Sequence, residues 1–350
     1  MAGADGARPA FLFAHHAGFD QEWPFVAERL KARLSQLGTV QEAVCPRDRP
    51  LCEVADLGRV AAVALFGGRL TAGCLQAAPH LRALAVNTDN SGYGLPLRDV
   101  WAREIAVIDT TAAWGQSVAE CALGLALGFL RRIPQWHQRM AAGEALWHFP
   151  LAQYCDDANF VAGDLGERRV GVMGAGQIGG RIARFCHALG SDVAVYDPYA
   201  PDSRIAESGA RRIDLDGLID HSEVLFVAVP PTPSARGLLS GECIGRLARG
   251  SLVVAVTRAH ALDMAALRRR ILAGELAGAF DVYDVEPLPP DDPLRGRDNV
   301  VHTPHIAGRT RDANHRTADM VVEGFRRVLA GDTPQGLLTP HAVAVRTGEA

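Results

Sequence analysis

Three polar residues in the second half of the chain have side chains suited to chemistry on a carbonyl group. Arg258 and His305 each follow an apolar run, and Glu286 lies in a proline-rich loop. A guanidinium can clamp a carboxylate through two hydrogen bonds and polarise a neighbouring carbonyl oxygen. A histidine beside a glutamate can donate a proton to a forming alcohol, because the carboxylate stabilises the imidazolium. Together they predict carbonyl reduction, or alcohol oxidation, next to a carboxylate.

Taken one at a time, these residues also have interpretations without chemistry. Arg258 would form a surface salt bridge, Glu286 would be a solvated loop residue, and His305 would be a hydrogen-bonded core histidine. Their joint occurrence after a nucleotide-binding motif favours the catalytic interpretation.

That motif is the glycine pattern Gly174-x-Gly176-x-x-Gly179, between an expected strand (169–173) and an expected helix (179–189). The first glycine makes a tight turn, the second lets the backbone approach a pyrophosphate, and the third lets the helix pack on the strand. The helix N-terminus offers free N–H groups to phosphates. The pattern is weak alone, but its place between strand and helix predicts a dinucleotide site. The expected contacts include Gln177 and Ile178.

Asp197 ends the next expected strand, eighteen residues beyond Gly179. A carboxylate there accepts hydrogen bonds from the adenosine ribose and repels a 2′-phosphate. Arg204 is the nearest following cation in the sequence and lies well past the strand end. NAD is therefore favoured over NADP, although Asp197 could also simply form a turn before Pro198.

The elements that must position these residues alternate between apolar strands and amphipathic helices, which predicts parallel βαβ units. A mostly apolar helical stretch (112–140) is expected to stop or kink at Pro134 and to mark a domain boundary. The last strong helix is expected at 311–329, followed by a partly disordered tail. Expected strands are 10–13, 60–66, 81–86, 105–108, 169–173, 192–196, 224–229, 252–256, 278–283 and 299–302.

Bulk composition indicates an ordinary globular protein, since 48% of the 350 residues are hydrophobic and 22% are charged. A net charge of -4 gives no electrostatic case for nucleic acid or an anionic membrane. Seven unpatterned cysteines indicate reduced thiols. Residues 1–10 do not resemble a signal peptide, and the apolar helix 121–130 is too short to span a bilayer. We expect a cytoplasmic protein without a metal site.

With these motifs in hand, the chain resembles the D-isomer-specific 2-hydroxyacid dehydrogenases over roughly residues 60–330. The most specific stretches are Asp281–Pro290 and Thr303–Gly308. The resemblance implies two doubly wound α/β domains, with a Rossmann NAD domain (116–303) inserted into a flavodoxin-like substrate domain (1–115 and 304–350). It also implies a homodimer, built partly by the helix 116–132, and interconversion of a 2-oxo acid and a D-2-hydroxy acid.

The family's site residues carry over onto matching positions. Arg258 matches the substrate-binding arginine, His305 the acid/base, and Glu286 its partner, whereas Asp281 matches an aspartate that faces the nicotinamide amide. Further cofactor contacts are implied at Val229, Pro230, Thr257 and Gly308, and substrate contacts at Asn87, Thr88, Asp89 and Asn90.

Several departures from the family pattern bear on the substrate. Ala259 and His260 replace two glycines beside Arg258, and Ala235 replaces a threonine near the nicotinamide loop. The segment 87–94 replaces a glycine-rich turn that holds the substrate carboxylate, and Asp89 there would disfavour a simple acid. These changes favour, weakly, a substrate that carries hydroxyl or amino groups.

Two other functions stay open at this stage. One is a tailoring dehydrogenase of secondary metabolism that acts on a non-standard substrate. The other is an NAD-sensing corepressor-like binding protein, although no peptide-binding or nuclear-targeting segment is visible. Residues that would line the pocket or simply pack are His15, His16, Trp114, Trp147, His148 and Tyr154.

Overall fold

The computed structural model describes residues 8–87, 94–144, 146–147, 154 and 157–347. The chain forms two compact units, Met1–Trp114 with Arg309–Ala350 (unit 1) and Gly115–Gly308 (unit 2). The divisions expected at 115/116 and 303/304 differ from these by one and five residues. Segment 304–308 stays with unit 2 because its backbone donates hydrogen bonds to the buried Asp281 there.

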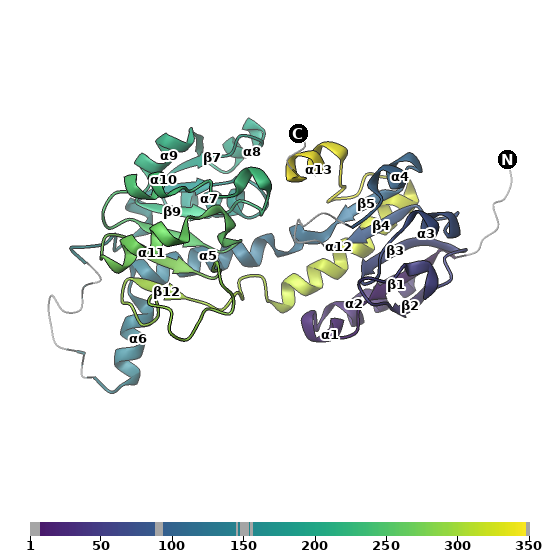
Figure 1. Ribbon diagram of the computed structural model, residues 1–350, viewed down its shortest axis with the longest axis horizontal. Helices are drawn as coiled ribbons and strands as arrows, with labels where there is room; N and C mark the ends of the chain where they lie inside the picture. Colours follow the sequence, from purple (N-terminus) through teal and green to yellow (C-terminus); the bar gives the residue numbers. More distant parts are fainter. Residues whose placement is uncertain (1–7, 88–93, 145, 148–153, 155–156, 348–350) are drawn as a thin grey trace. The chain divides into compact units, whose positions relative to one another are not determined.

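Unit 1 contains a five-stranded parallel sheet with the order β2-β1-β3-β4-β5, which is the flavodoxin-like order. Helices α2 and α12 lie side by side on one face of the sheet, and α3 and α4 cover the other (Figure 1). The strands are β1 (Ala10–His15), β2 (Thr39–Val44), β3 (Val60–Phe66), β4 (Ala83–Val86) and β5 (Ala106–Asp109). The helices are α1 (Phe19–Glu22), α2 (Val26–Leu37), η1 (Leu51–Glu53), α3 (Ala72–Ala77), α4 (Leu97–Ala102), η2 (Thr110–Trp114), α12 (Arg311–Ala330) and α13 (Pro340–Thr347).

Alternation along β1 shows how unit 1 builds two cores from one sheet. Phe11 and Phe13 pack with α2 and α12, and Phe11 stacks on Phe325 with ring centroids 5.9 Å apart. Leu12 and Ala14 point to the opposite face and pack with residues of α3 and α4. Successive side chains of a strand face opposite ways, so one buried strand supplies both cores.

Unit 2 contains a seven-stranded parallel sheet with the order β12-β11-β10-β9-β6-β7-β8. The chain order reverses between β6 and β9, where a doubly wound sheet binds its ligand at the carboxyl ends of the strands. The strands are β6 (Arg169–Met173), β7 (Asp192–Tyr196), β8 (Arg211–Arg212), β9 (Val224–Val227), β10 (Leu252–Ala255), β11 (Ala277–Phe280) and β12 (Val300–His302). The helices are α5 (Gly115–Leu130), α6 (Ile133–Ala141), η4 (Leu165–Glu167), α7 (Gly179–Ala188), α8 (Asp202–Glu207), α9 (Leu215–His221), η5 (Pro233–Ala235), α10 (Gly241–Arg246), η6 (Ala259–Ala261) and α11 (Met264–Leu272).

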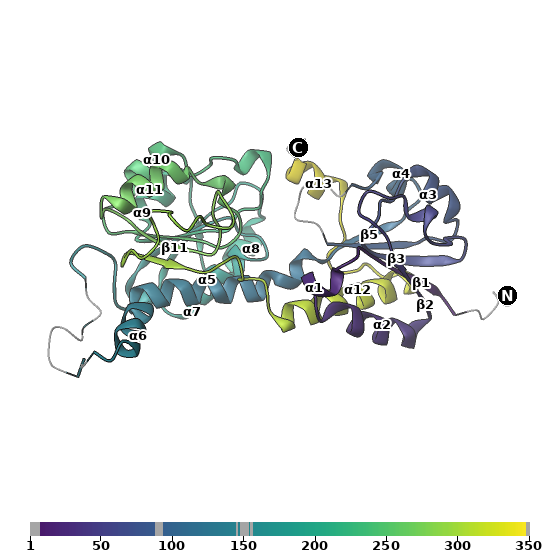
Figure 2. The same cartoon turned by 60° about the horizontal axis from the view of Figure 1, so that its bottom comes forward.

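Helices cover both faces of this sheet as well (Figure 2). Helix α5 packs against α7 and the strands β10 to β12, while α9, α10 and α11 enclose a hydrophobic core of unit 2. The stretch Thr110–Leu130 is long and apolar enough to cross a membrane, and 56% of it is buried within the protein. We therefore describe α5 as a core helix of unit 2.

The long helical stretch breaks earlier than the sequence predicts. Helix α5 ends at Leu130, Arg132 adopts a left-handed backbone with φ of 52°, and α6 begins at Ile133. Pro134 lies in the first turn of α6, where its missing N–H and fixed φ cost nothing. The proline therefore starts the second helix instead of ending the first.

The tail after α12, for which the sequence predicts partial disorder, contacts unit 1 at two described positions. The Leu338 N–H donates to the Val107 carbonyl, and Asp109 pairs with Arg346 of α13. These contacts attach the tail to β5, the edge strand of unit 1. Because they join segments more than 200 positions apart in sequence, local sequence patterns do not predict them.

Candidate active site

In the glycine turn between β6 and α7, the fold itself requires glycine at some positions, whereas another position leaves open space for a ligand. Gly174 has a φ of 94°, and a Cβ on Gly179 would lie 1.8 Å from the Gly174 carbonyl oxygen. These two positions are glycine because the chain itself leaves no room. A Cβ on Gly176 would meet no protein atom within 4 Å. The protein itself therefore does not require glycine at 176, and the missing side chain leaves room for a ligand to approach the backbone.

Backbone donors at the start of α7 are free to hold that ligand. Among the described residues, the N–H groups of 176–179, which lead into α7, donate to no protein acceptor. Four such donors at the positive end of a ten-residue helix suit a pyrophosphate. Gln177 is exposed there, and its side-chain oxygen accepts a hydrogen bond from Arg181. The geometry fits a dinucleotide at the predicted place.

Asp197 lies at the carboxyl end of β7, beside the glycine turn. Its Oδ2 accepts a hydrogen bond from the Ala175 N–H at 2.7 Å, and Oδ1 accepts from the N–H groups of Tyr199 and Ala200 at 2.8 and 2.9 Å. Three backbone donors thus fix the carboxylate where a ribose would meet it.

Arg212, which sequence reasoning missed, is the cation placed directly beside Asp197. Its guanidinium donates to the backbone carbonyls of Asp197 and Ala200 and to the Asp202 carboxylate. Arg204 was the expected neighbour because it is nearer in sequence. Strand β8 pairs with β7 and brings Arg212 back to the ribose end. A cavity of about 390 Å³ opens here, lined by Tyr196, Asp197, Pro198, Arg212, Ile213 and Asp214.

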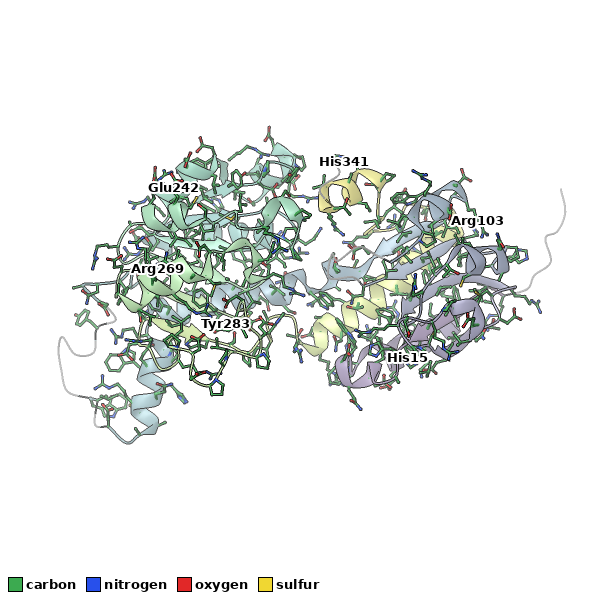
Figure 3. The ribbon with its side chains drawn as sticks, viewed as in Figure 1. His15, Arg103, Glu242, Arg269, Tyr283 and His341 are labelled. Carbon is green, nitrogen blue, oxygen red and sulfur yellow. The ribbon has the colours of Figure 1, made fainter. Side chains whose placement is uncertain are left out.

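Arg258, His305 and Glu286 form one hydrogen-bonded chain in unit 2. Arg258 Nη1 lies 3.3 Å from His305 Nε2 and donates to the Thr257 carbonyl at 2.8 Å. On the other side of the imidazole, His305 Nδ1 lies 2.6 Å from Glu286 Oε2. Glu286 Oε1 accepts from the backbone N–H of Tyr283, which follows β11 (Figure 3). The three predicted residues therefore meet although they come from three separate loops.

The middle member of this chain remains accessible. The side chains of His305 and Glu286 are 38% and 34% exposed, so a small molecule can reach the imidazole. Arg258 Nε and Nη2 have no protein partner in the described part of the chain. A carboxylate can thus bind this guanidinium while Nη1 stays beside His305.

Asp281 holds the loop that carries His305. Its carboxylate is fully buried and accepts hydrogen bonds from the Thr303 hydroxyl at 2.6 Å and from the N–H groups of Ile306 and Ala307 at 2.9 Å. His305 between them has a φ of 54°, a left-handed backbone that a histidine rarely adopts. The buried carboxylate offsets that strain. This positioning role was not predicted, and the predicted contact with the nicotinamide amide stays a prediction.

The remaining predicted cofactor residues lie in the same region of unit 2. Val229 and Pro230 follow β9, and the Thr257 hydroxyl donates to the Val229 carbonyl at 3.1 Å, which ties two of these loops together. Gly308 follows the Asp281-bound loop.

His260, the substitution beside Arg258, is partly buried. Neither ring nitrogen has a hydrogen-bond partner among the described residues. Burial lowers the pKa of His260 and the positive charges of Arg236 and Arg258 lower it further, which together outweigh a polar contact with the Pro230 backbone that raises it. An imidazole whose nitrogens make no hydrogen bond of standard geometry therefore lies next to the proposed carboxylate clamp.

Of the predicted substrate residues in unit 1, Asn87 lies at the carboxyl end of β4, and Thr88, Asp89 and Asn90 lie outside the described residues. Both polar side-chain atoms of Asn87 are buried without a hydrogen-bond partner in the part described. A buried amide without partners is costly, which marks this position as one that a ligand would satisfy.

Most of the other polar and aromatic residues considered have structural partners or are exposed. Trp114 stacks on Trp23 at a centroid distance of 4.9 Å, so it is a packing residue of unit 1. Trp147 and Tyr154 are 74% and 63% exposed, and His148 lies outside the described residues.

His15 ends β1 and His16 follows it, and both are almost fully buried. His15 hydrogen-bonds Glu42, and His16 hydrogen-bonds the Ala17 carbonyl and Arg47. Their ring nitrogens already have protein partners.

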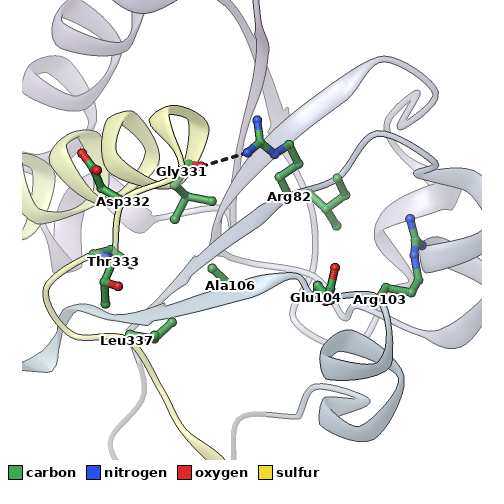
Figure 4. A pocket seen from close by; sticks show the side chains of 11 residues that line it. Arg82, Arg103, Glu104, Ala106, Gly331, Asp332, Thr333 and Leu337 are labelled. Carbon is green, nitrogen blue, oxygen red and sulfur yellow. Dashed lines mark hydrogen bonds between the residues drawn. The ribbon is translucent and has the colours of Figure 1, made fainter.

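A second cavity, of about 440 Å³, lies at the opposite edge of the unit 1 sheet, where β4 and β5 begin (Figure 4). Arg82 crosses it to the carbonyls of Val328 and Leu329 at the end of α12. Ligands of doubly wound sheets bind at the carboxyl ends of the strands, whereas this cavity lies at the amino ends of β4 and β5. The described residues hold no group of three His, Cys, Asp or Glu side chains placed for a metal ion.

Comparison with known proteins identifies relatives of this arrangement. Residues 123–307 match the family described as D-isomer specific 2-hydroxyacid dehydrogenase, NAD binding domain. The chain is 33% identical to D-3-phosphoglycerate dehydrogenase of Archaeoglobus fulgidus over 267 residues, which cover 75% of this chain and 48% of that protein. The chain therefore spans about half the length of this curated relative.

Two solved structures resemble the whole chain. A phosphoglycerate oxidoreductase from Rhizobium etli superposes with a TM-score of 0.80 at 26% identity, over 95% of this chain and 98% of the other. An NADPH-dependent glyoxylate/hydroxypyruvate reductase from Sinorhizobium meliloti, solved with NADP and malonate, gives a TM-score of 0.67 at 25% identity, over 95% and 97% of the two chains.

Proposed function

Because the chain belongs to the D-isomer specific 2-hydroxyacid dehydrogenase family, we propose that it interconverts a 2-oxo acid and a D-2-hydroxy acid with NAD(H). The observation that carries this proposal is the hydrogen-bonded chain Arg258–His305–Glu286. In this chain Arg258 can bind a substrate carboxylate, His305 can donate a proton through Nε2, and Glu286 contacts the other ring nitrogen, Nδ1.

Arg258 would bind the substrate carboxylate with its free Nε and Nη2 and polarise the adjacent carbonyl oxygen. In the direction of reduction, His305 Nε2 gives its proton to that oxygen, and in oxidation it takes the proton back. Glu286 holds Nδ1 and stabilises the charged imidazolium, which otherwise faces the positive Arg258. The proton therefore moves at one nitrogen in both directions.

NAD(H) would supply or accept the hydride when held by Gly174, Gly176, Gln177, Ile178, Gly179 and Asp197. The Asp197 carboxylate favours NAD, because a 2′-phosphate there meets a negative charge. Arg212 is the observation that favours NADP, since a guanidinium beside the ribose site could pair with a phosphate. We propose NAD, because the guanidinium is already engaged by two carbonyls and Asp202.

Cofactor choice is tested by kcat/KM for NADH and NADPH with one substrate, in the wild type and in Asp197→Ala and Arg212→Ala. We expect a preference for NADH that Asp197→Ala weakens and Arg212→Ala leaves in place. Equal use of both cofactors by the wild type would contradict the role of Asp197.

We propose that unit 1 is the substrate domain and that Asn87 and the following residues 88–90 contact the substrate. Helix α6 supports a homodimer, because no residue of it is buried and Ile133 and Met140 are 57% and 45% exposed. A second copy would cover these side chains. We propose a cytoplasmic location for the enzyme.

The decisive experiment is a panel of 2-oxo acids followed by NADH absorbance, with glyoxylate, hydroxypyruvate and pyruvate as references. Arg258→Ala should lower kcat/KM by about 10²–10⁴-fold, because it removes two charge-assisted hydrogen bonds. Arg249→Ala is the matched control, since that arginine is 69% exposed and pairs with Glu275. Turnover that survives Arg258→Ala would reject the proposed clamp.

The second candidate is a specialised tailoring dehydrogenase on a substrate with additional polar groups. His260 favours it, because its unpartnered ring lies beside the clamp where the family has glycine. If NADH binds but no acid in the panel is reduced, this candidate replaces the ordinary 2-oxo-acid reductase.

A further inference from the structure

Two cysteines of unit 1 lie in direct contact, far from the residues of the proposed chemistry in sequence. Cys52 in η1 and Cys74 in α3 have their Sγ atoms 2.7 Å apart, and the Cys52 N–H lies 3.3 Å from Cys74 Sγ. A disulfide bond requires about 2.05 Å, so the sulfurs need only a small approach. We propose that Cys52 and Cys74 are a redox modification site that forms a reversible disulfide.

The backbone around this pair is already held in place. The segment before Cys52 and the loop before α3 pair through two hydrogen bonds, from Leu51 N–H to the Arg69 carbonyl at 2.9 Å and from Arg69 N–H to the Arg49 carbonyl at 2.6 Å. Thr71 caps α3 by accepting from the Cys74 N–H. Closing the disulfide therefore needs side-chain rotation and little backbone movement, which is the usual obstacle to such a bond.

The surroundings of Cys74 make it the nucleophile of the second step, in which the disulfide forms. Burial raises the pKa of the Cys74 thiol, but donors from Cys52 and Thr71 outweigh burial, and the net pKa lies below its usual value. The Thr71 hydroxyl donates to its sulfur at 3.2 Å. Burial and the neighbouring sulfur raise the pKa of Cys52. Cys74 therefore forms a thiolate more readily than Cys52 does, and the thiolate is the form that attacks in thiol–disulfide chemistry.

Its exposure makes Cys52 the cysteine that reacts with the oxidant. Cys74 is fully buried, whereas Cys52 is partly exposed and can meet a small oxidant such as hydrogen peroxide. The Cys52 sulfur attacks one peroxide oxygen, the O–O bond breaks, and a sulfenic acid and one water form. The Cys74 thiolate then attacks the Cys52 sulfur and expels its hydroxyl as a second water. Two thiols and one peroxide give one disulfide and two waters, and a thiol reductant reverses the change.

A third cysteine provides the matched control. Cys45 is fully buried in the same core, and its thiol donates to the Arg49 carbonyl at 3.7 Å. It shares the environment of the pair without sharing the sulfur contact. Its substitution by serine should leave disulfide formation unchanged.

The three cysteines fall in separate tryptic peptides, because cleavage follows Arg33, Arg47, Arg59, Arg69 and Arg82 but not Arg49, which precedes Pro50. The intact protein is treated with a small molar excess of hydrogen peroxide, alkylated under denaturing conditions and digested. We expect peptide 48–59 linked to peptide 70–82, with two fewer thiols alkylated and full reversal by dithiothreitol. The unfolding midpoint should rise by roughly 5 °C on oxidation, because the link closes a loop in the unfolded chain.

Cys52→Ser should abolish the linked peptide and the stabilisation, and Cys45→Ser should preserve both. Cys52→Ser carries the test if Cys74→Ser does not fold, since Cys52 is not fully buried. The proposal is overturned if peptide 34–47 joins the link, if Cys52 goes on to sulfinic acid while Cys74 stays reduced, or if oxidation leaves all three thiols free.

Discussion

Both parallel sheets have polar residues at the carboxyl ends of their strands, but the hydrogen bonding of these residues differs between the two units. In unit 2, Asp281, Glu286 and the backbone orient His305, yet the imidazole and part of Arg258 stay accessible. In unit 1, His15, His16 and Asp109 bond to their own unit, whereas Asn87, at the carboxyl end of β4, keeps two unused side-chain polar atoms.

This contrast indicates that unit 2 would carry out the reaction and that unit 1 would select the substrate. Groups that act on a reacting atom need fixed geometry before the substrate arrives. A residue that selects a substrate needs unsatisfied polar atoms that only the right ligand completes. Each variant below changes one side of this comparison.

The largest effect is expected for His305→Gln, which keeps a polar side chain but cannot carry the proton. We expect kcat to fall by about 10²–10⁴-fold, the usual contribution of general acid–base catalysis. NADH binding, followed by fluorescence titration, should be unchanged because the glycine turn is untouched. His80→Gln is the control, since His80 is exposed in unit 1. Loss of NADH binding in His305→Gln would show that the residue binds the cofactor, and it would contradict the proposed difference between the two units.

Asp281→Asn tests whether the chemistry depends on the buried carboxylate that holds the His305 loop. The amide would face donors with an NH₂ group, so the free energy of unfolding should fall by about 2–4 kcal/mol. The value of kcat should also fall while KM changes less, because His305 loses its orientation. Urea unfolding and steady-state kinetics measure the two effects. The exposed Asp291→Asn should change neither, and an unaltered kcat in Asp281→Asn would separate the loop from the chemistry.

Sequence patterns predicted most of this arrangement because buried parallel strands read as short apolar runs. The expected runs recovered most strands of both sheets, and their polar successors Arg258 and His305 came together as predicted. Strand β2 was missed because it is an edge strand, and four of its six side chains are exposed. Helix α13 was missed because none of its residues is buried.

Parts of the candidate site depend on contacts that no local pattern contains. Arg212 meets Asp197 from fifteen positions away, through the pairing of β7 and β8. Asp281 meets Ala307 from twenty-six positions away. Residue type and strand ends predict which polar groups gather, whereas the hydrogen bonds between loops decide which of them position the others.

Asn87→Ala tests the unit 1 side of the comparison with effects of opposite sign. Removing two buried, unpartnered polar atoms should leave the free energy of unfolding unchanged or raise it by about 1 kcal/mol. KM for the 2-oxo acid should rise about tenfold, since one hydrogen bond to a charged group is worth about 1.5 kcal/mol. Thr110→Ala is a contrast, because its hydroxyl is already bonded to the Val86 carbonyl, so that variant should lose stability and keep KM. A stability loss without a KM change in Asn87→Ala would make this residue structural.

The smallest effect concerns pH, and it belongs to unit 2. Burial lowers the pKa of His302, and the charge of Arg295 lowers it further. The unfolded chain then binds the proton more readily than the folded one, so stability is complete above the ordinary histidine pKa of about 6.5 and declines as pH falls below it. The His302 Nε2 donates to the Leu294 carbonyl at 3.0 Å, and in the neutral imidazole Nδ1 is free to accept from the Tyr283 hydroxyl, which lies 2.6 Å away. At pH 7, the free energy of unfolding of His302→Asn should be about 1–2 kcal/mol below that of the wild type. Between pH 7 and pH 5 this free energy should fall less in the variant than in the wild type, as measured by urea unfolding at each pH. Tyr283 also donates its N–H to Glu286, so His302 supports a residue that contacts the proposed site. If the stability of the variant and of the wild type changes equally with pH, the loss of stability in acid does not come from His302.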